Sequence, residues 1–79
     1  MTWVMYKKNG RRELINLDRV KKIMIVPNKD ECSIMFVDDG PIGEVKVKDE
    51  AEALSLVVNM TIAHKSNNPL FPIETEVRK

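Results

Sequence analysis

The stretch from Arg12 to Val26, RELINLDRVKKIMIV, decides more about the fold than any other part of this chain. A helical spacing in it aligns Leu14, Leu17, Lys21 and Met24. That face would belong to a basic helix of the kind that lies in a DNA groove. However, five of the thirteen residues from Leu14 to Val26 are β-branched, and Pro27 closes the run where a helix would need another amide donor. We therefore predict strands on both sides of a corner at Asp18 and Arg19.

Runs of apolar residues, or apolar residues alternating with polar ones, also predict strands through the first two thirds of the sequence. Asn9-Gly10 supplies the positive φ angles of a tight hairpin turn between strands near residues 2–7 and 11–17. Strands over residues 20–26 and 32–37 are joined by the turn sequence PNKDE. A last strand, residues 43–48, alternates valines with charged residues. These short connections predict an antiparallel meander of about five strands.

A change of period after residue 48 predicts a helix from Glu50 to Lys65. Asp49 is placed to accept bonds from the first free amides, and Glu52 to reach back, which is a capping box. Two prolines then forbid helix in the remaining residues. We therefore predict an α+β fold in which residues 1–65 form one domain with the helix packed on the sheet, and residues 66–79 an extended tail.

The predicted helix is apolar on two sides. The stripe expected to cover the sheet consists of Leu54, Val57, Val58 and Ile62. The second stripe must be covered by the tail, by a second copy of the chain or by an irregular core, since exposed apolar patches mark interaction sites. We predict an interface there, most simply in a homodimer, formed by Leu56, Met60, Ala63, Leu70, Phe71 and Ile73.

Composition excludes several classes of protein. Thirteen basic against twelve acidic residues give a formal charge of +1, too balanced for a long-range pull on nucleic acid or an anionic membrane. The single cysteine excludes an internal disulfide. There is no signal-peptide pattern, and no apolar run approaches the roughly 20 residues that span a membrane. We predict a cytoplasmic protein without a membrane partner.

The sequence offers no convincing catalytic or metal site. His64 and Cys32 are the sole residues of their kinds and fall on separate predicted elements, so a nucleophile and base pair would need chance proximity. Asp38, Asp39 and Glu44 flank a turn and could hold a hard cation, but Asp-Asp-Gly-Pro is turn chemistry in its own right. We predict no enzymatic activity, no cofactor and no metal.

Basic residues gather in two clusters. They are Lys7, Lys8, Arg11 and Arg12 at the first hairpin tip, and Arg19, Lys21 and Lys22 at the corner. Both clusters could contact a phosphate backbone, yet charged hairpin tips also keep proteins soluble and protect edge strands. The stretch that might have been a recognition helix reads as strands, which weakens the nucleic-acid case. Nucleic-acid contact is therefore the alternative to protein binding.

Three segments, INLDRVKKIMI, SIMFVDDG and KDEAEALSLVVNMTIAHK, resemble those of small proteins from phages and other bacterial mobile elements. Such proteins combine an "NLD" strand corner, a strand ending in an aspartate-glycine turn, and a final helix with an acidic cap. The resemblance covers residues 1–65 and implies a pleckstrin-homology-like or simpler meander-plus-helix fold. The lack of a catalytic motif, the two-sided helix and the apolar tail predict a non-enzymatic accessory protein of a phage or mobile element that binds another protein, for example as an inhibitor or modulator of a host defence component. A small nucleic-acid-associated regulator is the alternative.

Overall fold

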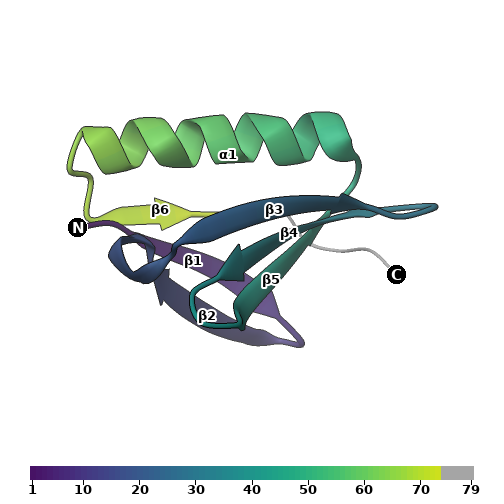
Figure 1. Ribbon diagram of the computed structural model, residues 1–79, viewed down its shortest axis with the longest axis horizontal. Helices are drawn as coiled ribbons and strands as arrows, with labels where there is room; N and C mark the ends of the chain where they lie inside the picture. The colour runs from purple at the N-terminus through teal and green to yellow at the C-terminus, as the bar shows by residue number, and fades with distance from the viewer. Residues whose placement is uncertain (74–79) are drawn as a thin grey trace.

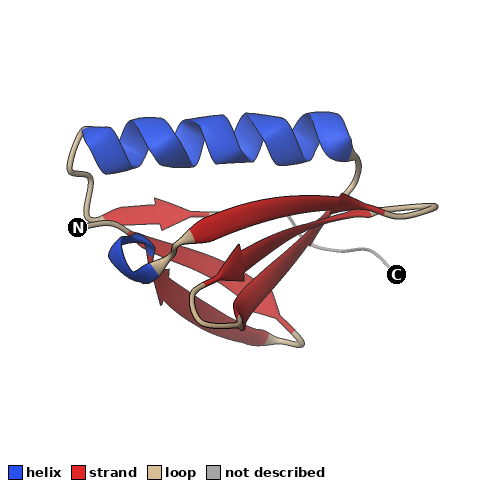
Figure 2. Ribbon diagram, in the orientation of Figure 1, coloured by secondary structure: helices blue, strands red, loops and turns tan. Residues whose placement is uncertain are grey.

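The structure is a computed structural model that describes residues 1–73, and it has an α+β fold (Figure 2). Its strands are β1 (Trp3–Lys8), β2 (Arg11–Asn16), β3 (Lys22–Pro27), β4 (Cys32–Val37), β5 (Pro41–Val47) and β6 (Leu70–Pro72). A short 3-10 turn, η1 (Leu17–Arg19), follows β2, and the one α-helix among the described residues is α1 (Glu50–Lys65). The predicted class, the five strands before the helix and the bounds of the helix are confirmed.

The strands form two sheets, with the orders β2-β1-β6 and β3-β4-β5. The prediction of a single meander is wrong at η1, where the chain leaves the first sheet and starts the second. Two bonds hold this corner: Asn16 Oδ1 accepts the Asp18 amide at 3.0 Å, and the Val20 amide donates to the Leu17 carbonyl at 3.1 Å. A short polar residue before the corner thus offers the backbone an alternative to continuing the strand.

The extended tail returns to the first sheet as a strand. β6 pairs in parallel with β1, and Figure 1 shows it beneath the end of α1. The Trp3 amide donates to the Pro69 carbonyl at 3.0 Å, and the Ile73 amide donates to the Met5 carbonyl at 2.8 Å. The Thr2 hydroxyl donates to the Asn68 carbonyl at 2.6 Å. The tail beyond Ile73 lies outside the described residues. Residues 66–73 therefore belong to the domain instead of trailing from it.

The core lies between the inner faces of the two sheets and under α1 (Figure 1). Its buried members include Val4, Tyr6 and Ile15 from the first sheet, Ile34, Phe36 and Val45 from the second, Ala53 and Met60 from α1, and Ile73. The central strand β4 has buried side chains on both of its faces, at Ser33 and at Ile34, as expected for a strand with apolar residues on both faces.

The predicted sheet-facing stripe of α1 is only partly right, since Val57 alone of its four residues packs against the core. Leu54, Val58 and Ile62, expected against the sheets, are 50%, 55% and 57% exposed. Met60 and Ala63, expected at an interface, are buried. The helix packs through a stripe that contains two alanines, and small side chains let the helix backbone approach the sheets closely. A large apolar stripe remains on the outside.

The capping box at the start of α1 is confirmed. Asp49 accepts a bond from the Glu52 amide at 2.9 Å, and the Glu52 carboxylate accepts one from the Lys48 amide at 2.9 Å. Asp49→Ala is expected to lower the free energy of unfolding by roughly 0.5–2 kcal/mol, because the first turn loses its side-chain acceptor. Urea denaturation measures this effect. Asp30→Ala, in the exposed turn before β4, removes the same charge and should change stability by less than about 0.5 kcal/mol.

The buried hydroxyl of Tyr6 gives the fold an alkaline limit. Burial, followed by the bond that the hydroxyl donates to Glu13 at 3.1 Å, raises the pKa of Tyr6 from 10.0 to about 12. The neutral hydroxyl therefore stabilises the folded state fully below pH 10, and this contribution is lost as pH rises toward 12.

Tyr6 is the only tyrosine, so tyrosinate absorbance reports its titration directly. We expect little tyrosinate in the folded chain at pH 10, the ordinary pKa of the group. Glu13→Gln should lower the titration midpoint while leaving it above 10, since burial is the largest cause of the shift. Full titration near pH 10 with the fold intact would contradict this assignment.

Candidate functional site

A groove of about 330 Å³ lies between η1, the start of β3 and the last turns of α1. Leu17, Val20, Ile23 and Met60 supply its apolar lining, and Lys21, Lys22, Thr61, His64 and Lys65 supply its polar lining. Its volume is at the lower end of the range for binding pockets. A groove of this size accommodates a few side chains.

The strand that borders the groove is an edge strand. β3 pairs with β4 on one side, and no strand among residues 1–73 pairs with its other side. Lys22 and Met24 are exposed on it, whereas Ile23 and Ile25 are half-buried. An unpaired edge presents backbone donors and acceptors that can bind an extended chain. The groove and the edge together offer both side-chain and main-chain contacts.

Cations dominate the rim of the groove. Lys22 and Lys65 are exposed there, one on each wall. His64 Nε2 lies 2.8 Å from Asp18 Oδ1, and this contact lowers the pKa of the Asp18 carboxyl below its ordinary value of 3.8. Asp18 does not line the groove, so Lys22 and Lys65 make the rim favourable to a ligand with negative charge.

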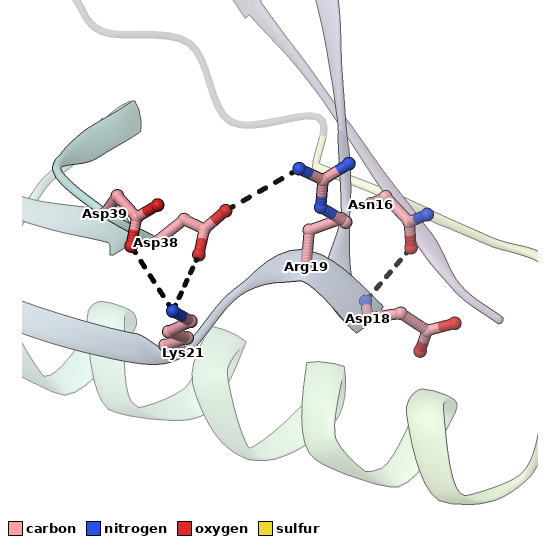
Figure 3. A network of polar contacts seen from close by, with 6 residues as sticks. All are labelled: Asn16, Asp18, Arg19, Lys21, Asp38 and Asp39. Atoms are coloured by element: carbon pink, nitrogen blue, oxygen red, sulfur yellow. Dashed lines mark hydrogen bonds and ion pairs between the residues drawn. The ribbon is translucent and has the colours of Figure 1, made fainter.

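Ion pairs neutralise the rest of the corner. Figure 3 shows Lys21 turned toward two acids, with its Nζ 3.6 Å from Asp38 Oδ1 and 3.3 Å from Asp39 Oδ1. Arg19 lies 3.9 Å from the other oxygen of Asp38. Of the three corner cations predicted to contact nucleic acid, Lys22 alone lies outside this network. Of the three acids considered for a hard cation, Asp38 and Asp39 contact basic side chains.

The two predicted basic clusters do not form one surface. Lys7 pairs across the hairpin with Arg12, and Lys8 with Arg11, so four cations surround the tip between β1 and β2. The corner cations lie at the opposite end of β2, five strand steps or about 17 Å away. A phosphate backbone would meet the clusters as separate sites.

The predicted interface residues are mostly covered by the chain itself. Met60, Ala63 and Ile73 are buried, which corrects their assignment to an exposed interface. Leu56 and Phe71 are half-buried against the core, and Leu70 is 45% exposed. The tail thus covers its own core, which was the alternative to a dimer at these residues.

A second apolar surface lies on the outer face of the β2-β1-β6 sheet. The strand register places Met5 beside Leu14 and Pro72, and Trp3 beside Leu70. Trp3 is 38% and Leu14 53% exposed. This outer sheet face is separate from the groove, since none of its residues lines the groove. Binding experiments on the groove therefore need to distinguish it from this outer sheet face.

The structure does not bring Cys32 and His64, the two residues considered for catalysis, close together. Cys32 is buried in β4, whereas His64 is exposed near the end of α1 and contacts Asp18. Among residues 1–73, no three His, Cys, Asp or Glu side chains are placed to hold a metal ion. Within the same residues, no helix is long and apolar enough to cross a membrane.

Comparisons with protein-family models, with curated proteins and with solved structures find no match to this chain. The resemblance to small phage and mobile-element proteins therefore stays a prediction. The function of the chain has to be argued from its own surfaces.

The sequence patterns indicated residues on both walls of the groove but not the groove itself. Lys21 and Lys22 were singled out for their charge, and Met60 for its place on the second stripe. The missed residues come together only because β3 is an edge strand beside α1; they are Leu17, Val20, Ile23, Thr61 and Lys65. An apolar-lysine-lysine-apolar run from Val20 to Ile23 was the available signal.

Proposed function

We propose that this protein is a non-enzymatic protein-binding module that captures an extended, acidic and apolar segment of another protein. The segment adds as a strand to the free edge of β3. Its apolar side chains enter the groove beside Ile23 and Met60, and its acidic side chains lie near Lys22 and Lys65. The observation that carries the proposal is a strand edge that residues 1–73 leave unpaired, beside an apolar groove with a cationic rim.

Strand addition fits the chemistry of this surface. Main-chain bonds to an edge strand supply affinity, and pockets for alternate side chains supply specificity. On β3 the side chains alternate between half-buried Ile23 and exposed Lys22, so a paired strand with alternating apolar and acidic residues complements both.

The biological setting rests on the sequence resemblance. We propose that the module serves a phage or mobile element in the cytoplasm of the host cell, by inhibiting or modulating a host protein such as a defence component. A short captured segment suits such a role, because one groove can then block a partner's own strand pairing. The homodimer predicted from the sequence also remains a proposal, on the outer side of α1, as argued below.

Binding of a labelled synthetic peptide with alternating Glu and Val residues tests the proposal by fluorescence anisotropy. Peptides with Lys in place of Glu, or Ser in place of Val, should bind far more weakly. Lys22→Glu should weaken binding of the Glu-Val peptide by roughly three- to tenfold, because a rim attraction becomes a repulsion.

Lys8→Glu is the matched control, since it makes the same change of charge at an exposed strand end away from the groove. It should alter the affinity less than about twofold. Equal losses in both variants would show that the peptide responds to overall charge, and absence of binding by the wild-type chain would reject the proposal.

The second candidate is nucleic-acid binding through the hairpin tip. Two facing cation pairs favour it, Lys7 with Arg12 and Lys8 with Arg11. DNA binding that falls steeply with salt and is lost in Lys8→Glu but kept in Lys22→Glu would support this candidate over the peptide groove. We expect no such binding near physiological ionic strength, because the net charge is only +1.

A further inference from the structure

The outward stripe of α1, formed by Leu54, Val58 and Ile62, has no use in the proposed peptide site. Its residues are spaced every four positions, and each is at least half exposed. The inner side of the same helix already packs on the core through Ala53, Met60 and Ala63. The outward stripe is therefore an apolar surface additional to what the fold needs.

The charges along α1 specify which partner fits the outward stripe. Glu50 and Glu52 stand in the first turn, and His64 and Lys65 in the last. Relative to Val58, Glu50 lies eight residues before and Lys65 seven residues after, or about 12 and 10.5 Å along the axis. The helix is therefore acidic at one end and basic at the other, with an apolar centre.

A second copy of α1 running antiparallel complements this pattern. A twofold axis at Val58 places Leu54 of one copy against Ile62 of the other. The same axis brings Glu50 of each copy near Lys65 of the other, on the same side of the helix pair. The dimer therefore contains two equivalent charge pairs. A parallel pair would instead bring like charges together, which is unfavourable.

We propose that the chain forms a homodimer through an antiparallel pair of α1 helices centred on Val58. Residues 54, 58 and 62 form its apolar seam, and Glu50 and Lys65 form its flanking charge pairs. One short helix per copy buries less than the roughly 800 Å² per partner of a standard interface. The dimer is therefore weak and in exchange with monomer.

Sedimentation velocity of the full chain tests the dimer over protein concentrations from about 10 µM to about 1 mM. The wild-type chain should shift reversibly from monomer to dimer. Val58→Glu should raise the dissociation constant at least about tenfold, because the twofold axis brings the two carboxylates together in an apolar seam. Val58 is 55% exposed, so the fold should persist, as circular dichroism will check.

Leu14→Glu is the matched control, since Leu14 is 53% exposed on the outer sheet face. It should leave the dissociation constant within about twofold of the wild type. A dimer that is lost in Leu14→Glu and kept in Val58→Glu would move the interface to that sheet face and overturn the proposal. A wild-type chain that stays monomeric at the highest concentration would overturn it as well.

A charge exchange tests the antiparallel direction. Glu50→Lys and Lys65→Glu should each raise the dissociation constant roughly two- to fivefold, and the double variant should return close to the wild-type value. In a parallel pair, neither single variant would be rescued by the other. Failure of the rescue while Val58→Glu still disrupts the dimer would reject the antiparallel arrangement.

Discussion

A chain that ends at Lys65 is expected to lose its cooperative unfolding transition. The missing segment contains Ile73, which is buried in the core, and Phe71, which packs against it. Full burial of an apolar side chain of this size stabilises a fold by roughly 1.5–3 kcal/mol, so buried Ile73 and half-buried Phe71 together contribute roughly 2–4.5 kcal/mol. Small domains have only about 5 kcal/mol or little more in total.

The truncation also exposes the first sheet. Without residues 66–73, the Trp3 amide, the Met5 carbonyl and the Thr2 hydroxyl lose their partners, and β1 becomes an edge strand. An apolar edge strand is a site of aggregation. We therefore expect aggregation of the shortened chain by light scattering, together with the loss of a thermal transition.

A chain that ends at Ile73 is the control for this truncation. It keeps β6 and each of these bonds, so it should unfold cooperatively. Ile73→Ala in the full chain should lower the free energy of unfolding by about 2–5 kcal/mol, as other large-to-small core substitutions do. A stable, monomeric chain ending at Lys65 would show that β6 is dispensable.

Gly43→Val is expected to be the most damaging substitution in β5. A Cβ at Gly43 would collide with Ile15 Cδ1 and approach the Tyr6 hydroxyl oxygen to 2.8 Å. Ile15 and Tyr6 belong to the other sheet and are buried, so both side chains would have to shift within the core. Overpacking of a core typically costs about 1–3 kcal/mol, and the valine methyl groups place the effect at the upper end or beyond.

A double variant tests whether the collision with Ile15 is the cause. Ile15→Val removes the Cδ1 atom that the new Cβ would meet and alone should cost about 0.5–1.5 kcal/mol. With Gly43→Ala, the combined loss measured by urea denaturation should be smaller than the sum of the single losses. Gly40→Ala is the control, because its Cβ would meet no atom within 4 Å. If the losses of the two single variants simply add in the double variant, the collision with Ile15 is not the cause of the destabilisation.

The sequence was sufficient for the elements that depend on local chemistry. Asn9 and Gly10 do adopt positive φ angles of 53° and 78°, as the hairpin turn requires. Asp49 predicted the start of α1 as its N-cap, and Pro27 predicted where β3 ends. In each case a few neighbouring residues determine the backbone, so no knowledge of distant contacts was needed.

The side of α1 that packs on the sheets could not be derived in the same way. Both of its sides are apolar, and the larger, β-branched side was assigned to the core. The side that packs instead carries the buried Ala53, Met60 and Ala63, with Val57 half-buried against the core. It faces β3, β4, β5 and β6, which are strands distant from one another in sequence.

The groove was beyond sequence reasoning for a related reason. Its walls, at residues 17–23 and 60–65, are separated by about forty residues and meet only after η1 has started a second sheet. A single meander would have placed β3 inside a sheet, with both edges paired. The break at η1 leaves β3 at an edge and thereby creates the candidate site.

The most direct test of the proposed function is an amide-resolved NMR titration of the isotope-labelled chain with the Glu-Val peptide. We predict shifts confined to the β3 amides from Lys22 to Val26 and to α1 from Met60 to Lys65, with slowed hydrogen exchange along β3. Shifts centred on Trp3 and Leu14, or on the hairpin tip at residues 7–12, would contradict the strand-addition site.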